Sequence, residues 1–389
     1  MAGDAAATPV LTAGIRPMVA VSRGSAEAMA RDFAAAFAGA APAAILLFAA
    51  DGACLPALWL KLRAAFGPDC RVLGCSSAGE FAFGGYDSGS TVAIALPAAH
   101  FTIAPVLLPE LRASASLNWL LALREAAEQV PDQPGRSRFG ILLIDGLSQR
   151  EELVSALIDA TLPGTLVLGG SAGDGLRFAR TEVMLDGTNR PDSAIFCLMS
   201  TDFAVEEIVF DHIMPTPARM VVTEADPEQR LILEIDAEPA AQEYARLIGV
   251  APGALCPAAF AENPLLVQIG GKQFVRAISG VAPGGGLRLM SSVDTGSVMT
   301  LGRAVDLTDG LEDRLARLGR PAALILGFDC ILRRIALEQA GLQEDAARIF
   351  RRWNVAGFNT YGEQHGGIHV NQTFVGLAFL DPDPVSPHA

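Results

Sequence analysis

The stretch Val355-Ala356-Gly357-Phe358-Asn359-Thr360-Tyr361-Gly362-Glu363, near the C-terminus, is the fullest copy of a motif that the chain contains three times. In it, an apolar strand end is followed by a glycine, a short polar turn, a second glycine and a carboxylate. The earlier copies are Val72-Leu73-Gly74-Cys75-Ser76-Ser77-Ala78-Gly79-Glu80 and Val167-Leu168-Gly169-Gly170-Ser171-Ala172-Gly173-Asp174. We name the copies the first, second and third corners, in chain order. Their recurrence indicates an internal repeat.

The three corners share the same sequence surroundings. An apolar run that closes on an aspartate precedes each corner, at 45–51, 141–145 and 324–329, and a helix-like segment fills the gap. A further strand follows each corner, at 91–96, 194–199 and 373–379. Short apolar runs bounded by turn residues are typical of buried strands, and two strands joined by a helix form a parallel crossover. We therefore predict an α/β fold of repeated β-α-β-β units that form mixed parallel and antiparallel sheets.

Glycines at the carboxyl ends of parallel strands allow the backbone to approach a ligand, and α/β proteins place their ligands at these ends. The same glycines also serve tight turns. Three copies favour a shared architecture over three working sites.

Hydrophobic periodicity and turn residues predict the other elements. Strands are expected at 18–22 and 101–108, and helices at 25–37, 55–66, 114–129 and 308–318. Ser148 to Glu151 fits a capping box at the start of the helix in the second repeat. Hairpins at 220–236 and 265–278 predict an α+β insertion, over about 202–310, between the second and third repeats.

The composition excludes several classes of protein. Of 389 residues, 51% are hydrophobic and 19% are charged, so the chain can bury a large core. The net charge of −14 argues against nucleic acids and anionic membrane surfaces as partners. The six cysteines form no C-x-x-C pair, which argues against a disulfide framework or a zinc site and indicates a reducing compartment.

The N-terminal region carries no targeting signal in this reading. Residues 33–50 hold no charge, but Gly39 and Pro42 interrupt them, so a helix end, a turn and a strand are expected there in place of a membrane span. Residues 1–12 contain Asp4 and no basic residue, unlike a signal peptide. We therefore predict a cytoplasmic protein.

Two groups of motifs resemble the FIST family. Asp145-Gly146-Leu147-Ser148, together with the second corner, resembles the FIST N-terminal region. Asp329-Cys330-Ile331-Leu332-Arg333-Arg334, the third corner with Gln364, and His369-Val370-Asn371-Gln372-Thr373 resemble the FIST C-terminal region. The resemblance covers about 43–379. It implies a FIST N-type domain at 43–235 and a FIST C-type domain at 236–380, after an N-terminal tail, strand and helix at 1–42 and before a tail at 381–389.

The resemblance implies a bacterial sensory protein of signal transduction that binds a small ligand and is not an enzyme. Stand-alone members include nitric-oxide-sensing haem proteins that regulate a histidine kinase or a cyclic-di-GMP enzyme in trans. The chain shows no kinase, cyclase or transmitter segment of its own, so its output is expected to pass through such a partner.

Haem iron requires an axial His, Cys, Met or Tyr beside an apolar cavity. His369 is the first choice of metal ligand and His365 the second, because they flank two glycines within the best motif. Arg333 and Arg334 suit haem propionates. In the alternative interpretation, His369 hydrogen-bonds its own loop, Asn371 caps that loop, and the arginines begin a solvated helix.

A haem-free sensor of an amino acid or similar polar metabolite is the second hypothesis. Backbone N–H groups of the glycine turns would hold the carboxylate of the ligand, and Asp145, Asp174 or Glu363 its amine. The candidate ligand-binding residues are therefore His369, His365, Arg333, Arg334, Tyr361, Glu363, Asn371, Asp145, Ser171 and Asp174.

A serine esterase of the α/β-hydrolase type is the third and least favoured hypothesis. Gly169 to Gly173 matches the G-x-S-x-G nucleophile elbow, and Asp329 and His369 follow Ser171 in the order of that fold. An elbow requires a helix directly after it, however, and 174–185 alternates like a strand.

Overall fold

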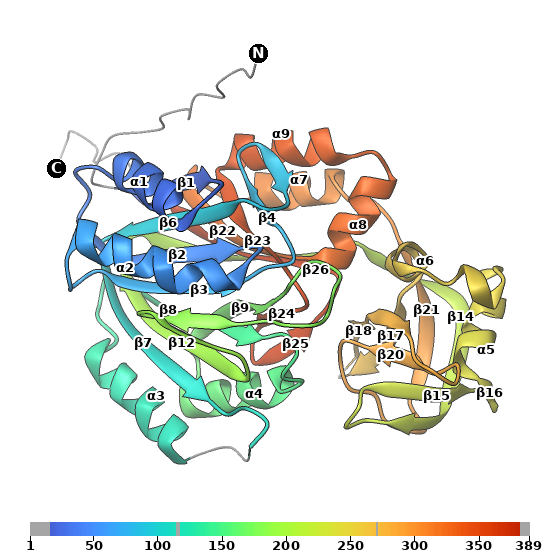
Figure 1. The fold of residues 1–389 in the computed structure, drawn as a ribbon. Helices are drawn as coiled ribbons and strands as arrows, with labels where there is room; N and C mark the ends of the chain where they lie inside the picture. Colours follow the sequence, from blue (N-terminus) through green and yellow to red (C-terminus); the bar gives the residue numbers. More distant parts are fainter. Residues whose placement is uncertain (1–15, 114–116, 270, 382–389) are drawn as a thin grey trace.

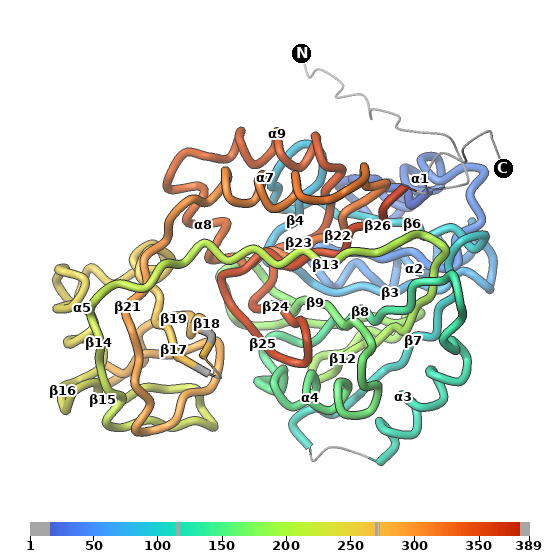
Figure 2. Tube along the Cα trace, turned by 180° about the vertical axis from the view of Figure 1, so that it is seen from behind, coloured from blue at the N-terminus to red at the C-terminus, as the bar shows by residue number. Residues whose placement is uncertain are grey.

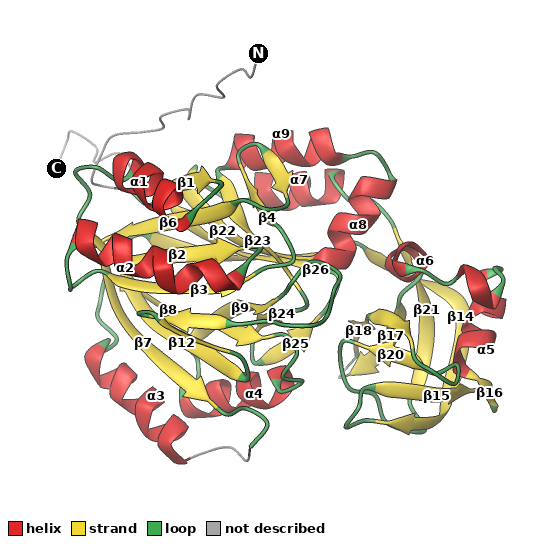
Figure 3. Ribbon diagram, in the orientation of Figure 1, coloured by secondary structure: helices red, strands yellow, loops and turns green. Residues whose placement is uncertain are grey.

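The computed structural model describes residues 16–113, 117–269 and 271–381. The predicted tails and the first residues of the helix expected at 114–129 lie outside these ranges. Figure 1 shows a large body and a small body. Figure 3 shows that both combine helices with sheets, which confirms the α/β fold class with mixed parallel and antiparallel sheets. We use "small body" for residues 213–304 and "large body" for the other described residues.

The large body consists of three units with the same order of strands, and the third has one more helix than the others between its parallel strands. The first unit contains β1 (Met18–Ser22), α1 (Ala26–Ala36), β2 (Pro42–Ala49), α2 (Leu55–Phe66), β3 (Arg71–Ser76), β4 (Glu80–Ala82), β5 (Gly85–Asp87) and β6 (Thr91–Pro97). The second contains β7 (Phe101–Pro109), α3 (Leu117–Gln129), β8 (Ser137–Asp145), α4 (Glu151–Thr161), β9 (Leu166–Ala172), β10 (Val183–Leu185), β11 (Thr188–Arg190) and β12 (Ser193–Thr201). The third contains β13 (Ala204–Asp211), α7 (Asp309–Ala316), β22 (Ala322–Cys330), α8 (Ile331–Gln339), α9 (Gln343–Trp353), β23 (Val355–Thr360), β24 (Glu363–His365), β25 (Ile368–Val370) and β26 (Thr373–Leu380).

The predicted crossovers are confirmed. β2 pairs in parallel with β3, β8 with β9, and β22 with β23, each across a helical connection. The repeat is longer than predicted, because each unit also begins with a strand and a helix: β1 and α1, β7 and α3, β13 and α7.

The units exchange their hairpins in a cycle. β4 of the first unit pairs with β23 of the third, β10 of the second with β3 of the first, and β24 of the third with β9 of the second. Each of the three six-stranded sheets therefore contains strands from two units. Because backbone hydrogen bonds join every unit to both others, the three units form one body.

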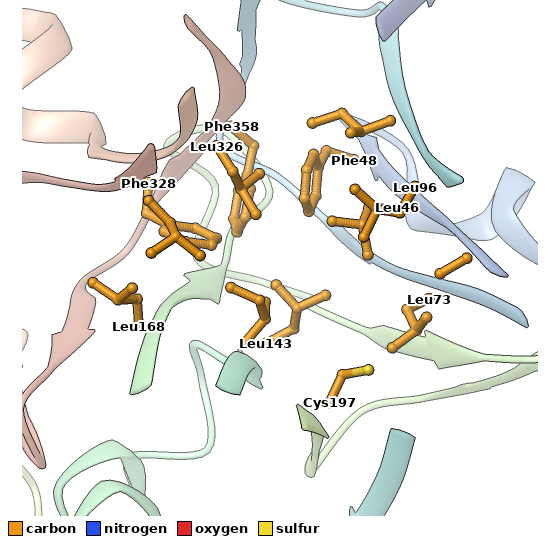
Figure 4. Close-up of a cluster of buried hydrophobic side chains, with 14 of the residues drawn as sticks. Leu46, Phe48, Leu73, Leu96, Leu143, Leu168, Cys197, Leu326, Phe328 and Phe358 are labelled. Atoms are coloured by element: carbon orange, nitrogen blue, oxygen red, sulfur yellow. The ribbon is translucent and has the colours of Figure 1, made fainter. Parts of the chain in front are cut away.

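The inner faces of the three sheets meet at one apolar core. Figure 4 shows Leu46 and Phe48 of the first sheet facing Leu143 and Leu168 of the second and Phe358 of the third. The rings of Phe48 and Phe358 stack with centroids 4.5 Å apart. Alternate side chains along a strand point to opposite faces, so Ile45 and Leu47 pack instead against the outer helices.

Each outer sheet face is covered by helices of its own unit (Figure 1). α1 and α2 pack on the first sheet, α3 and α4 on the second, and α7 and α9 on the third. Ser25 caps α1 as predicted, because its hydroxyl accepts a hydrogen bond from the N–H of Ala28 at 3.2 Å. The prediction of a capping box at Ser148 is wrong. α4 begins at Glu151 and its N-cap residue is Arg150, while the Ser148 hydroxyl accepts a hydrogen bond from the N–H of Arg150 at 3.3 Å.

The small body is the predicted α+β insertion, with corrected limits. It contains β14 (Ile213–Asp226), β15 (Leu231–Ile235), β16 (Glu238–Pro239), α5 (Ala240–Ile248), α6 (Pro257–Glu262), β17 (Leu265–Ile269), β18 (Lys272–Arg276), β19 (Ile278–Val281), β20 (Leu287–Leu289) and β21 (Val298–Ala304). The expected start near 202 is wrong, because β13 pairs along its length with β26 and belongs to the third unit. Figure 2 shows the chain entering the small body through β14 and leaving it through β21. No helix in the described ranges is long and apolar enough to cross a membrane.

Candidate functional site

The three corners converge, as the repeat predicts. Each corner donates one backbone N–H group to a backbone carbonyl of another corner. The donor is the residue four positions after the first glycine of its corner, and the acceptor is the residue two positions after the first glycine of the other corner. The three hydrogen bonds run from Ala78 to Asn359 (2.9 Å), from Gly173 to Ser76 (3.1 Å) and from Tyr361 to Ser171 (3.1 Å). The cycle follows the order of the hairpin exchange, so the corners have equivalent positions around one pseudo-threefold centre.

The first glycine of each corner is required by the close approach of the parallel strands. A Cβ at Gly74 would overlap the carbonyl oxygen of Leu47, and one at Gly169 that of Leu142. The glycines are therefore architectural, as predicted. The motif aligns the carboxylates of the three corners, but in the structure they are not all in register. Glu80 and Glu363 stand six positions after their first glycine, and Asp174 stands five after Gly169.

Each unit has an equivalent place, called its cleft here, between the loop after its first parallel strand and the segment supplied by the neighbouring unit. In the second unit, Tyr361 fills this cleft, because a Cβ at Gly146 would lie 3.0 Å from the Tyr361 ring. The buried Tyr361 hydroxyl donates to Asp174 and lies 3.0 Å from the carbonyl of Gly175. Its ring stacks on Phe178, with centroids 4.5 Å apart.

The third cleft is filled by charged and aromatic side chains. Arg333 is buried and donates to both carboxylate oxygens of Asp329, at 3.0 and 3.2 Å, and to the Tyr86 hydroxyl at 3.2 Å. Arg334 donates to the carbonyl of Asp87 at 2.8 Å and to Oδ1 of Asn359 at 3.2 Å. Both predicted ligand arginines are thus held by protein groups.

The first cleft is hollow, and the residue that takes the place of Tyr361 in the hydrogen-bond cycle there is Gly173. The cavity has a volume of about 180 Å³. The polar residues that line it are Asp51, Ser76, Asp174, Arg177, Arg180 and Glu182. Of the ten predicted site residues, only Asp174 lines this cavity.

The loop between β9 and β10 supplies most of the polar wall. The Asp174 carboxylate accepts hydrogen bonds from the N–H groups of Phe178, Ala179 and Arg180 at 2.9 to 3.0 Å. Burial alone would raise the pKa of Asp174, but these bonds and the Tyr361 hydroxyl lower it. Asp174 therefore stays ionised and fixes the loop that carries the cavity arginines.

The arginines at the cavity retain free donors. The Arg177 side chain is 71% exposed, and only its Nε donates, to the carbonyl of Asp174 at 2.9 Å. Arg180 donates to Oε1 of the buried Glu182, while Oε2 of Glu182 accepts from Asn189 at 2.8 Å. Asp51 accepts from the N–H of Ala53 at 3.0 Å. The cavity thus combines two guanidinium groups with carboxylates.

His369 lies elsewhere, where the small body packs on the large body. It is 5% exposed, and its Nδ1 lies 3.2 Å from Nε2 of Gln364. Its Nε2 is buried and has no hydrogen-bond partner. Burial lowers the pKa of His369, partly offset by Glu151 and Glu152. The ring is therefore neutral near pH 7.

The structure links three further predicted residues to this region. Ser171 is buried and accepts from Nε2 of Gln364 at 2.9 Å. Asn371 accepts from the Ser291 hydroxyl at 2.6 Å. Gln364 thus bridges Ser171 and His369, the Asn371 side-chain amide donates to the carbonyl of Tyr361 at 3.4 Å, and the Tyr361 hydroxyl donates to Asp174.

The other three candidates, Asp145, His365 and Glu363, also lie apart from the cavity. Asp145 accepts from the N–H groups of Leu147 and Asp192 at 2.9 and 2.5 Å, which fixes the loop after β8. His365 is partly exposed and lies 3.5 Å from Glu207, away from His369.

The serine esterase geometry is not assembled among the described residues. The Ser171 hydroxyl is bonded to Gln364, and Asp329 is paired with Arg333. No helix follows the second corner, where the loop from Asp174 runs into β10.

The carboxylate of the third corner predicts a pH dependence of stability. Burial raises the pKa of Glu363 to about 8, against hydrogen bonds from Thr360 and Thr373 that lower it. The folded form thus holds a proton that the unfolded chain releases near pH 4.5, so this contribution to stability is lost as pH rises from about 4.5 to about 8. We expect Glu363→Gln to flatten that decline by up to about 1.4 kcal/mol per pH unit in urea unfolding. Glu128→Gln, at an exposed position on α3, is the control. If the free energy of unfolding falls with pH equally steeply in both variants, the expectation is contradicted.

The pattern of the FIST N domain matches residues 43–238, and that of the FIST C domain matches residues 240–365. The chain belongs to the FIST family. The resemblance seen in the sequence is thereby confirmed at the level of the family. FIST domains are associated with the sensing of small ligands in signal transduction. Comparison with curated proteins finds none that matches the chain.

Sequence reasoning missed Asp51, Arg177, Arg180 and Glu182 as neighbours of one cavity. The available signal was small: the second corner is one residue shorter and has glycine where the third has tyrosine. Asp51 was noted only as the end of a strand.

Proposed function

We propose that this FIST protein is a non-enzymatic sensor of an amino acid or similar small zwitterionic metabolite, which binds in the cavity of the first unit. The observation that carries the proposal is that one of three equivalent clefts is hollow while side chains fill the other two. Side chains occupy the clefts of the second and third units, whereas the first unit keeps a concave hollow on which several polar groups converge, as they do at ligand sites.

The charges around the cavity support a zwitterion. The free donors of Arg177, with Arg180, suit a carboxylate, because guanidinium groups bind carboxylates in a planar, two-bond arrangement. Asp51 and Glu182 on the same wall suit an ammonium group. The ligand amine is thus proposed to bind Asp51 and Glu182, and not Asp145 or Glu363, while Asp174 holds the loop.

The size of the cavity supports a small guest. A volume of about 180 Å³ is below the roughly 300–1,000 Å³ of pockets for drug-sized ligands. It exceeds the roughly 150 Å³ that holds benzene in an engineered protein cavity. A single amino acid is of this order.

The test is thermal stabilisation of the full chain by proteinogenic L-amino acids, each followed by titration calorimetry. A charge-assisted hydrogen bond contributes about 1.5–3 kcal/mol, so Arg177→Ala is expected to weaken binding by roughly tenfold or more. Arg317→Ala, at an exposed position at the end of α7, is the matched control. No stabilisation by any amino acid, or equal affinity for both variants, would contradict the proposal.

Haem-based sensing of nitric oxide through His369 is the second candidate. The observation in its favour is the neutral imidazole with an unpartnered Nε2. The residues around the ring do not fit haem in this arrangement, because Nε2 is buried and the ring lies against the backbone of Gly362. No group of three or more His, Cys, Asp or Glu in the described ranges is placed to hold a metal ion.

An absorption spectrum of the purified chain after incubation with haem tests this candidate. A Soret band that shifts on addition of nitric oxide and is lost in His369→Ala is the result expected for haem sensing. His365→Ala, at the partly exposed second choice, is the control. A chain that stays colourless would remove haem from consideration.

The output of either sensor is proposed to act in trans on a histidine kinase or a cyclic-di-GMP enzyme in the cytoplasm. Co-purification of such an enzyme in a ligand-dependent manner would support this assignment, and a ligand-independent complex would contradict it.

A further inference from the structure

One loop touches both the cavity and the packing surface of the small body. Residues 174–182 run from the end of the second corner to β10. Arg177 and Arg180 from this loop line the cavity. Phe178, between them, stacks on Tyr361 and packs against an apolar cluster shared by the two bodies.

That apolar cluster forms the junction between the bodies. The small body contributes Ala261, Leu266, Val275, Ala277 and Met290, and the large body contributes Ala78, Cys330, Ile331, Leu332 and Tyr361. The small body therefore lies over the place where the corners converge.

The loop is held in a conformation that its residues do not adopt by themselves. Phe178 has φ of 49°, in the left-handed region that bulky side chains rarely occupy. Three N–H bonds to Asp174 and the stacking on Tyr361 hold it there. A residue in such a sparsely populated region persists only where the surrounding structure holds it.

Polar contacts complete the junction. Arg230 of the small body is 4% exposed and donates to Glu151 at 2.6 Å and to Glu152 at 2.5 Å. The N–H of Ser292 donates to Glu152 at 3.3 Å. Two chain connections, the apolar cluster and these contacts, with the hydrogen bond from Ser291 to Asn371, hold the small body in place.

We propose that residues 174–182 couple the cavity to the junction, so that an amino acid in the cavity tightens the packing of the small body. This inference rests on the proposed ligand site. A carboxylate between Arg177 and Arg180 would hold the loop and therefore keep Phe178 stacked on Tyr361. Because coupling is reciprocal, loosening the junction must weaken ligand binding by the same factor.

Hydrogen exchange of the full chain, with and without each proteinogenic L-amino acid, tests the coupling. An amino acid that raises the melting temperature is expected to slow amide exchange within residues 213–304. Phe178→Ala is expected to remove this effect, whereas Leu176→Ala, an exposed position in the same loop, is expected to retain it.

Reciprocity gives the second measurement. Arg230→Gln is expected to weaken the affinity for that amino acid by about fivefold or more, the lower end of typical couplings. Glu152→Gln, whose side chain is partly exposed, serves if Arg230→Gln fails to fold.

The outcomes separate the two proposals. An amino acid that binds the unaltered chain without slowing exchange in residues 213–304, and binds the junction variant with unchanged affinity, overturns the coupling and leaves the ligand site standing. If no amino acid binds, both proposals fall.

Discussion

Replacing Arg333 with methionine is expected to lower the free energy of unfolding by about 3–5 kcal/mol, because it removes the charge partner of the buried Asp329 carboxyl group. The pair is fully enclosed, with Arg333 1% exposed and Asp329 0%. Burial alone would lower the pKa of Arg333, but the Asp329 carboxylate raises it, so the guanidinium group stays charged. Arg333 also donates to the carbonyl of Leu307 at 2.7 Å, which joins α8 to the segment before α7.

Urea unfolding with a double variant checks the cause of this loss. Asp329→Asn with Arg333→Met removes both charges and is expected to recover at least half of the lost stability. The reason is that the attraction within a buried ion pair does little more than offset the cost of removing the two charges from water. Arg348→Met, at an exposed arginine paired with Glu312 at 3.0 Å, is the control and is expected to change little. A double variant as unstable as Arg333→Met would show that shape, and not charge, sets the cost.

The position of Arg333 also bears on function. In the third cleft, Arg333 and Tyr86 occupy the space that is hollow in the first. The resemblance to the FIST family led us to assign Arg333 and Arg334 to a ligand, but in the structure they bind Asp329 and Asn359. An arginine in a motif signals an anion partner, and the sequence does not say whether that anion is a ligand or a carboxylate of the same chain.

The sequence was sufficient for the parallel pairs and the corners. Continuous apolar runs such as 45–49 and 141–144 are unambiguous, and the corner glycines mark where they end. It was insufficient for the hairpin exchange, because β4, β10 and β24 are three residues long and their partners are set by contacts between distant units. The same reason hid β13, whose partner β26 lies beyond the whole small body.

The open cleft was also beyond the sequence argument. Its position depends on which side chains enter each cleft, and the three clefts can be compared only in the correct register of the second corner. Asp174 was aligned with Glu80 and Glu363, a shift of one residue that concealed the equivalence of Gly173 and Tyr361. Hydrogen bonds of the cycle resolve the register, because Gly173 and Tyr361 donate to equivalent carbonyls.

Gly357→Ala is the second large effect and tests the architecture directly. Backbone torsion is not the obstacle, because Gly357 is not among the glycines with positive φ. The obstacle is steric: an added Cβ would overlap the carbonyl oxygen of Gly327 on the parallel partner and lie 3.0 Å from the Phe81 ring. A backbone oxygen cannot rotate away, so we expect a loss at or above the upper end of overpacking costs, about 3 kcal/mol.

Gly319→Ala is the matched control for this prediction, since nothing lies within 4 Å of an added Cβ there. It is expected to be neutral or to stabilise by up to about 1 kcal/mol, because alanine restricts the unfolded chain. The urea midpoint of Gly357→Ala should fall while the slope stays constant. Strands forced apart at Gly357 would also shift Asn359, which accepts from Ala78, so the disturbance passes to the first corner. If Gly357→Ala unfolds at the same midpoint as Gly319→Ala, the glycine is not needed for close strand approach, and the cycle of corners is not what holds the large body together.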